Sequence, residues 1–194
     1  MSPGSKGTGP RRAAAAAILA ALLVLASGCG KAQPPSAASE ADFEAALAHA
    51  PGPLKRLYSQ HGRVLDGGVA AFRRQLAELR GYPVVVNKWA SWCGPCRFEF
   101  PFFQRLSQKR GTRIAFLAVD SLDAKDAAKR FLRKYPVPYP SFFDPKGDIA
   151  QAFRGERVSP TTAFYDSKGA LLYTKQGGYS AEAAIAADLD RYAH

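Results

Sequence analysis

The chain is poor in the side chains that bind metal ions. Its 194 residues include only three cysteines and three histidines. A structural zinc site requires four ligands, and His49, His61 and His194 stand in no ligand spacing. A copper carrier would need a histidine opposite a cysteine pair, and none of the three is well placed for that role. We therefore predict neither a metal nor an organic cofactor.

The chain also lacks a hydrophobic run long enough to cross a membrane in its first part. As a helix, the uncharged apolar stretch 13–26 would span about 21 Å, short of the roughly 30 Å hydrocarbon core. No acidic residue precedes this stretch, whereas Lys6, Arg11 and Arg12 do. Basic residues followed by a short apolar run are typical of a secretory signal. We predict a signal peptide over residues 1–28.

The sequence LASGC ends at Cys29 and is similar to a bacterial lipobox, in which the cysteine is lipidated and becomes the new N-terminus. An ordinary cleavage after Gly28, releasing a soluble secreted protein, stays open, and the Arg11-Arg12 pair leaves twin-arginine export open as well. Residues 29–40 are rich in Pro, Ser and Ala and have no apolar period. We interpret them as a flexible linker with a lipid anchor at Cys29.

Basic residues outnumber acidic ones, with 27 Lys and Arg against 16 Asp and Glu. Because the cations are scattered, they are typical of a solvated surface, and we predict no binding to nucleic acid. Combined with a lipid anchor, a basic surface would favour an anionic membrane. We therefore expect the protein outside the cytoplasm, anchored to the outer face of the cytoplasmic membrane.

Residues 41–194 have the pattern of one folded domain with its core over 82–194. Apolar spacings of three and four predict helices between 41 and 80, and beyond Pro83 short apolar strands alternate with helices, which predicts parallel pairing. Asp123 and Ser180 are the expected N-cap residues of two of these helices. The predicted elements are a helix at 69–79, strands at 84–89, 113–119, 161–165 and 170–174, and helices at 94–108, 123–134 and 180–192.

Two of the three cysteines stand two residues apart in the sequence WCGPC, directly after the apolar run VVVNKW. A cysteine at the start of a helix is favoured as a thiolate by unpaired N–H groups and by the helix dipole, which predicts Cys93 as a nucleophile. Cys96, one turn further on, would then attack the sulfur of Cys93 and resolve a mixed disulfide. Pro95 stiffens the loop between the two sulfurs.

Structural interpretations of the same pair are weaker. A disulfide that closes a loop of about four residues contributes roughly 2 kcal/mol by loop entropy, against about 4.7 kcal/mol for a loop of about 100 residues. Two buried cysteines that act as small apolar groups would not need Gly-Pro between them. Redox chemistry is therefore the interpretation we favour.

The motifs resemble the TlpA-like branch of the thioredoxin superfamily, the exported thiol-disulfide proteins related to cytochrome c maturation. The residues that carry the resemblance are WASWCGPC at 89–96, Glu99, Pro101, DPKG at 144–147 and PTT at 160–162. The resemblance implies an α/β thioredoxin fold, with a central mixed sheet flanked by helices and an extra strand and helix at about 139–153. Residues 41–80 lack the family's usual N-terminal hairpin, so we expect a helical extension there.

The resemblance also implies roles for residues near the cysteines. Pro160 would follow a cis peptide bond and face the cysteine pair, and Ser159 would pair its backbone with a substrate chain. Trp92 would help to shape the substrate groove. The substrates would be protein thiols and disulfides, and a reductant outside the cytoplasm would depend on a membrane electron donor.

The residue at position 87 departs from the thioredoxin pattern. Thioredoxin carries a buried Asp where this chain has Asn87, and an amide cannot accept the proton of Cys96, so another base or water is required. Glu99, one turn after Cys96, is the nearest carboxylate in the sequence. The alternative is a helix-surface Glu that caps the helix or pairs with Arg97 or Arg105.

Position 88 departs from the family as well, because Lys88 stands where an apolar residue is usual. A lysine near the cysteines could depress a thiol pKa. On strand alternation, however, Lys88 faces away from Asn87 and Trp89, and we expect its side chain to reach the sheet edge and water.

The resulting hypothesis is an extracytoplasmic thiol-disulfide oxidoreductase with Cys93 as nucleophile and Cys96 as resolving thiol. The Cys-Gly-Pro-Cys loop is that of thioredoxin and favours a protein disulfide reductase. An oxidase of the same fold stays open. A thiol peroxidase of the peroxiredoxin kind is a further alternative, but it normally has a Thr three positions before its attacking cysteine, where this chain has Ala90.

Overall fold

The structure is a computed structural model that describes Met1, residues 39–156 and residues 158–194. The predicted signal peptide, Cys29 and most of the linker therefore lie outside the described residues. Within the described part, none of the helices combines the length and the apolar character needed to cross a membrane.

In the part of the chain that the structure describes, six strands form one mixed sheet in the order β1-β4-β3-β2-β5-β6. The first four strands in this order are parallel to one another, β5 is antiparallel to β2, and β6 is antiparallel to β5. The central strands β2 and β3 are buried along their whole length, as expected for strands covered by helices on both faces. The strands are β1 (Val64–Leu65), β2 (Val84–Trp89), β3 (Ala115–Ser121), β4 (Ser141–Asp144), β5 (Thr161–Tyr165) and β6 (Leu171–Gln176).

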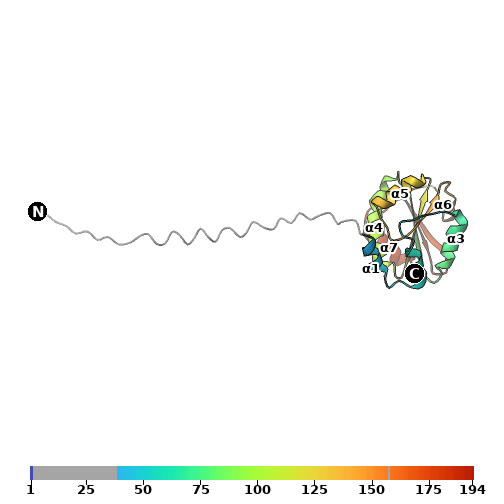
Figure 1. The fold of residues 1–194 in the computed structure, drawn as a ribbon, viewed down its shortest axis with the longest axis horizontal. Coiled ribbons are helices and arrows are strands. Elements are labelled where there is room, and N and C mark those ends of the chain that lie inside the picture. The colour runs from blue at the N-terminus through green and yellow to red at the C-terminus, as the bar shows by residue number, and fades with distance from the viewer. Residues whose placement is uncertain (2–38, 157) are drawn as a thin grey trace. The chain divides into compact units, whose positions relative to one another are not determined.

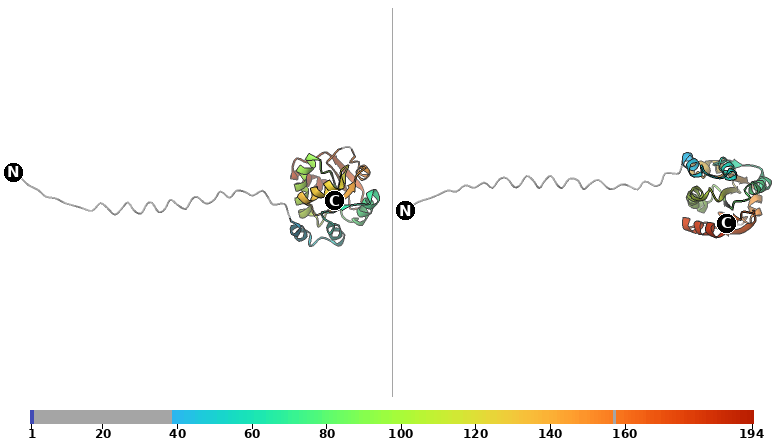
Figure 2. Two further views of the ribbon diagram at one scale, coloured as in Figure 1. Left: turned by 45° about the horizontal axis from the view of Figure 1, so that its top comes forward. Right: turned by 90° about the horizontal axis from the view of Figure 1, so that it is seen from below.

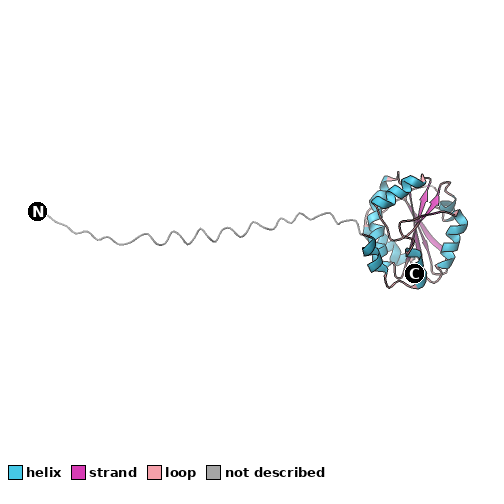
Figure 3. Ribbon diagram, viewed as in Figure 1, coloured by secondary structure: helices cyan, strands magenta, loops and turns pink. Residues whose placement is uncertain are grey.

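The described residues contain seven helices. Helices cover both faces of the sheet, as Figures 1 and 2 show. Helices α1, α4 and α7 lie on one side, and α3 and α6 lie on the other; Figure 3 shows the strands between them. The ring of Phe131 on α5 lies 4.9 Å from that of Phe100 on α4, so α5 covers the same face as α4. The helices are α1 (Glu40–Leu47), α2 (Gly52–Tyr58), α3 (Gly68–Glu78), α4 (Gly94–Arg110), α5 (Lys125–Lys134), α6 (Asp148–Ala152) and α7 (Glu182–Tyr192).

The predicted α/β thioredoxin fold is confirmed. Strands β2 and β5 match their predicted ranges, and β4 with α6 forms the expected extra strand and helix. Strand β3 begins two residues later than predicted, because Arg113 and Ile114 donate their N–H groups to the carbonyl of Arg110 and so continue the turn that ends α4. The helical extension also contains β1, a short strand beside β4 that the sequence pattern did not predict.

Both predicted N-caps are wrong. Helix α5 begins at Lys125 after Ala124, and α7 begins at Glu182 after Ala181, and neither N-cap makes a side-chain hydrogen bond. The carboxylate of Asp123 instead accepts hydrogen bonds from Ser91, in the loop before the cysteines. Ser91, which is distant in the sequence, thus binds the carboxylate that we expected to cap α5.

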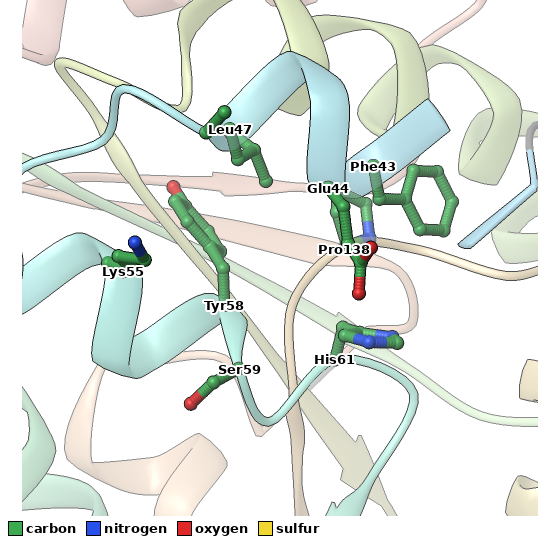
Figure 4. A pocket seen from close by; sticks show the side chains of 9 residues that line it. Phe43, Glu44, Leu47, Lys55, Tyr58, Ser59, His61 and Pro138 are labelled. Atoms are coloured by element: carbon green, nitrogen blue, oxygen red, sulfur yellow. The ribbon is translucent and has the colours of Figure 1, made fainter. Parts of the chain in front are cut away.

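The N-terminal helices enclose a cleft of about 460 Å³ beside the sheet. Figure 4 shows Phe43, Leu47 and Tyr58 on its apolar wall and Lys55 at one end. Tyr58 is fixed there, because its hydroxyl donates to the carbonyl of Ile114 at 2.8 Å. Neither cysteine of the WCGPC motif lines this cleft, so we place the candidate site elsewhere.

Candidate active site

Cys93 and Cys96 form a disulfide at the N-terminus of α4, with their Cα atoms 5.3 Å apart. Strand β2 ends at Trp89, a short loop follows, and Cys93 is the N-cap residue of α4. The sulfur of Cys93 accepts a hydrogen bond from the backbone N–H of Cys96 at 3.2 Å. This N–H and the positive end of the helix dipole would stabilise a thiolate at Cys93 after reduction.

The two cysteines are both nearly inaccessible in the disulfide form. Cys93 is 3% exposed and Cys96 is fully buried. The two residues therefore differ little in exposure in this form, and Cys93 is the slightly more accessible of the two.

The loop between β2 and α4 is held by residues that follow β3. Asp123 accepts from the N–H of Ser91 at 2.5 Å and from its hydroxyl at 2.9 Å. Burial alone would raise the pKa of Asp123, but the hydrogen bonds from Ser91 and from the N–H of Ala124 outweigh it and lower that pKa. The indole of Trp92 donates to the carbonyl of Leu122 at 3.0 Å, while 61% of Trp92 stays exposed next to the disulfide.

Glu99 is fully buried, so the alternative of a helix-surface Glu paired with Arg97 or Arg105 is wrong. Its carboxylate accepts from the amide of Asn87 at 2.8 Å and from the N–H of Tyr179 at 3.0 Å. Burial raises the pKa of Glu99 to about 7, although these two hydrogen bonds and the charge of Lys175 oppose the shift. A carboxyl group with this pKa changes protonation near neutral pH.

Glu99 lies on the same face of α4 as Cys96, because the two are three residues apart. Its surroundings also bring the distant proline loop to the helix start. A Cβ atom built on Gly178 would lie 3.2 Å from Pro160, 3.5 Å from the Glu99 carboxylate and 3.7 Å from Pro95. Glu99, Pro160 and the cysteine loop thus meet at Gly178, where a Cβ atom would be tight against Pro160 and in ordinary contact with the other two.

The peptide bond between Ser159 and Pro160 is cis. Pro160 is buried and its carbonyl accepts from the N–H of Gly177 at 3.0 Å, which ties the loop to the end of β6. Ser159 is partly exposed. The fold therefore brings Pro160 and Glu99 to the cysteine loop, with Trp92 exposed beside the disulfide.

Lys88 does not reach the sheet edge, and that expectation is wrong. The side chain is 1% exposed, and its ammonium donates to the carbonyls of Gly155 at 2.5 Å and Val158 at 2.8 Å. Burial lowers the pKa of Lys88, while the charges of Asp144 and Glu156 act in the opposite direction. The carbonyls of Gly155 and Val158 therefore accept the hydrogen bonds of the Lys88 ammonium that we expected water to accept.

Asp120, at the end of β3, is a buried group near the site that the sequence pattern did not single out. It pairs in register with Trp89, and neither carboxylate oxygen has a hydrogen-bond partner among the described residues. Burial, and then the nearby charges of Asp123 and Asp144, raise the pKa of Asp120 to about 8. The one available signal was its place at the carboxyl end of a parallel strand, where sites gather in open α/β sheets.

The fold and the paired cysteines define a thioredoxin-like protein. The profile of the Redoxin family matches residues 73–189, which is more than half of the chain. The chain belongs to this family.

Curated relatives and solved structures agree with this assignment. The chain is 28% identical to the thiol-disulfide oxidoreductase ResA of Bacillus thuringiensis over 56% of its own length and 62% of that protein. It is similar to a putative thiol:disulfide interchange protein DsbE from Chlorobium tepidum, at 29% identity and a TM-score of 0.55, with 60% and 83% of the two chains covered. An exposed lipoprotein thioredoxin from Streptococcus pneumoniae matches at 26% identity and a TM-score of 0.53, with 60% and 89% covered. The chain spans about three-fifths of the length of the first curated relatives it matches.

Proposed function

We propose that this chain is a thiol-disulfide oxidoreductase that works outside the cytoplasm and reduces protein disulfides. The observation that carries the proposal is the Cys93–Cys96 disulfide at the start of α4, where the sulfur of Cys93 accepts a hydrogen bond from the N–H of Cys96. The names of the relatives support the same reaction class.

In the proposed reaction the reduced protein gives two electrons to its substrate. The Cys93 thiolate attacks one sulfur of the substrate disulfide, and the other substrate sulfur leaves as a thiolate. Cys96 then loses its proton and attacks the sulfur of Cys93, which releases the second substrate thiolate and forms the Cys93–Cys96 disulfide. The protein is oxidised by two electrons, and a membrane dithiol donor would reduce it again.

Glu99 is the base we propose for the second step. It is a buried carboxyl near Cys96 with a pKa of about 7, so it can accept the Cys96 proton near neutral pH. Trp92, Ser159 and Pro160 would bind the substrate chain beside the disulfide. No cofactor takes part in this scheme.

We propose that residues 1–28 direct export, that Cys29 carries a lipid and that residues 29–40 tether domain 41–194 to the outer face of the cytoplasmic membrane. The basic and apolar N-terminal pattern supports this proposal, and so does the likeness to an exposed lipoprotein thioredoxin. A membrane location would bring the protein close to its electron donor.

The reduction potential of the cysteine pair tests the direction of electron flow. Thioredoxin, with the same loop, has a potential of about −270 mV, and the oxidase DsbA has one of about −120 mV. After equilibration with glutathione, we expect a value below about −230 mV. A value of about −150 mV or higher would leave an oxidase, and rapid turnover of hydrogen peroxide would instead identify a thiol peroxidase.

A further inference from the structure

Lys88 connects the strand that carries the cysteine loop to the loop that carries Ser159. Its ammonium is buried and holds two carbonyl oxygens, those of Gly155 and Val158. It lies on the face of the sheet opposite Asn87, which bonds to Glu99, because successive side chains of a strand alternate. Lys88 therefore contacts the substrate side of the site and not the group proposed to move the proton.

Lys88 is one of three polar residues that lie directly opposite one another on adjacent strands. Lys88 of β2 pairs with Thr161 of β5, and Thr161 pairs with Gln176 of β6. We call these three residues the polar row. The hydroxyl of Thr161 donates to the Val158 carbonyl at 2.7 Å, and the amide of Gln176 donates to the carbonyl of Arg154 at 2.6 Å.

The polar row therefore holds three carbonyl groups of the segment between α6 and β5. Gly155 allows the close packing of this segment, because a Cβ atom there would collide with the ring of Phe153. The Val158 carbonyl receives two donors, Lys88 and Thr161, and so points toward the sheet.

The orientation of the Val158 carbonyl fixes the next peptide group. The bond between Val158 and Ser159 is trans, and in a trans peptide the C=O and the following N–H point in opposite directions. Because the carbonyl points toward Lys88, the N–H of Ser159 points away from the sheet. That N–H has no backbone partner among the described residues.

We propose that Lys88 is a positioning residue for substrate binding, which holds the carbonyls of Gly155 and Val158 so that Ser159 presents its backbone to an extended segment of the substrate protein. This inference rests on the proposed function and specifies its substrate class as disulfides within extended peptide chains. A disulfide without a peptide backbone gains nothing from Lys88.

The test compares Lys88→Met with Lys129→Met, which removes the same charge from an exposed site on α5. Each variant is assayed with a peptide that contains an intrachain disulfide and with hydroxyethyl disulfide, which has no backbone. A hydrogen bond from a charged donor corresponds to about a tenfold change in an equilibrium constant. Because the bonds of Lys88 hold the binding orientation of Ser159, we expect Lys88→Met to raise KM for the peptide about tenfold. The rate with hydroxyethyl disulfide should stay within about twofold of that of Lys129→Met. The reduction potentials of the two variants should be nearly equal.

Two further variants separate positioning from folding. Lys88→Gln keeps an N–H donor and should recover part of the peptide KM, and Thr161→Val removes the second donor to Val158 and should raise the peptide KM without changing any charge. If Lys88→Met does not fold, Thr161→Val decides the question. An unchanged peptide KM, or an equal loss on both substrates, would overturn the inference. Wild-type protein that reduces neither substrate would instead refute the proposed function.

Discussion

Glu99→Gln removes the buried carboxyl group and can keep both of its contacts. The side-chain carbonyl of the substituted amide can accept from the N–H of Tyr179, as the carboxylate does. The NH₂ group of the same amide then faces Asn87, whose own carbonyl oxygen has no partner among the described residues. A rotation of the Asn87 amide would let that oxygen accept from the new NH₂ group, so the variant should fold with the native contacts.

The expected loss of rate follows from two pKa values. A thiol with an ordinary pKa of about 8.5 is only about 3% ionised at pH 7, so full deprotonation of such a thiol by a base gains about thirtyfold. Glu99, with a pKa of about 7, is half ionised at that pH. Half of this gain is about fifteenfold, and we expect Glu99→Gln to slow the second step about tenfold at pH 7.

A stopped-flow assay with a chromophoric disulfide resolves the two steps. The first thiol is released when Cys93 attacks, and the second is released when Cys96 resolves the mixed disulfide. We expect the second phase of the wild type to rise with pH and level off near pH 7, and that of Glu99→Gln to keep rising at higher pH, because the Cys96 thiol must then ionise without the base. The first phase should be the same in both proteins, which provides an internal control.

Stability provides an independent check on the same carboxyl group. Its pKa is raised from 4.5 to about 7, so the folded state holds a proton that the unfolded state has already released. Stability therefore falls as pH rises between these values, by up to about 3 kcal/mol in total. Glu99→Gln should be more stable than the wild type at pH 8 and not at pH 4.

The kinetic outcome decides the role of Glu99. Identical pH profiles of the second stopped-flow phase in the two proteins would refute the assignment of Glu99 as the base.

Three further predictions concern other groups. Iodoacetamide should label Cys93 before Cys96 in the reduced protein at pH 7, and Cys96→Ser should trap mixed disulfides at Cys93; labelling at Cys96 would reverse the two roles. Asp120→Asn should gain stability relative to wild type as pH rises from 5 to 8, by at most about 1.4 kcal/mol per pH unit, because the raised pKa of Asp120 makes the wild type lose stability over that range; a melting-temperature difference that is constant with pH would contradict this. Mature protein should stay with membranes and show the mass of a lipid on Cys29, whereas unmodified protein in the medium would exclude the anchor.

Strand–helix alternation and the WCGPC motif were enough to predict the central fold. The run VVVNKW between Pro83 and the cysteine loop gives β2 its full length, because a short apolar segment followed by a helix start allows few other structures. Strand β1 could not be predicted in the same way. It is two residues long and exists only because β4, which lies far along the chain, pairs with it.

Two of the wrong assignments, those of Asp123 and Lys88, share a physical cause, which is competition from distant partners. Asp123 has the side chain of an N-cap, but the N–H and hydroxyl of Ser91 offer it two donors near the cysteines. Lys88 has a long stem suited to reach water, yet the carbonyls of Gly155 and Val158, brought near by the fold, satisfy its charge inside the domain. Local sequence contains neither partner.

The proposed role of Glu99 would explain how the chain can dispense with the strand carboxylate of thioredoxin. Asn87 supplies no base, but its amide donates to Glu99, and the N–H of Tyr179 supplies the second donor from beyond β6. Without these two bonds, a fully buried carboxyl would stay protonated well above neutral pH. With them its pKa is about 7, so Asn87 and Glu99 together would place the proposed base on the helix that carries Cys96. Replacing Asn87 with Leu should then raise the pKa of Glu99 further. The rate of the second phase should therefore level off at a higher pH than in the wild type.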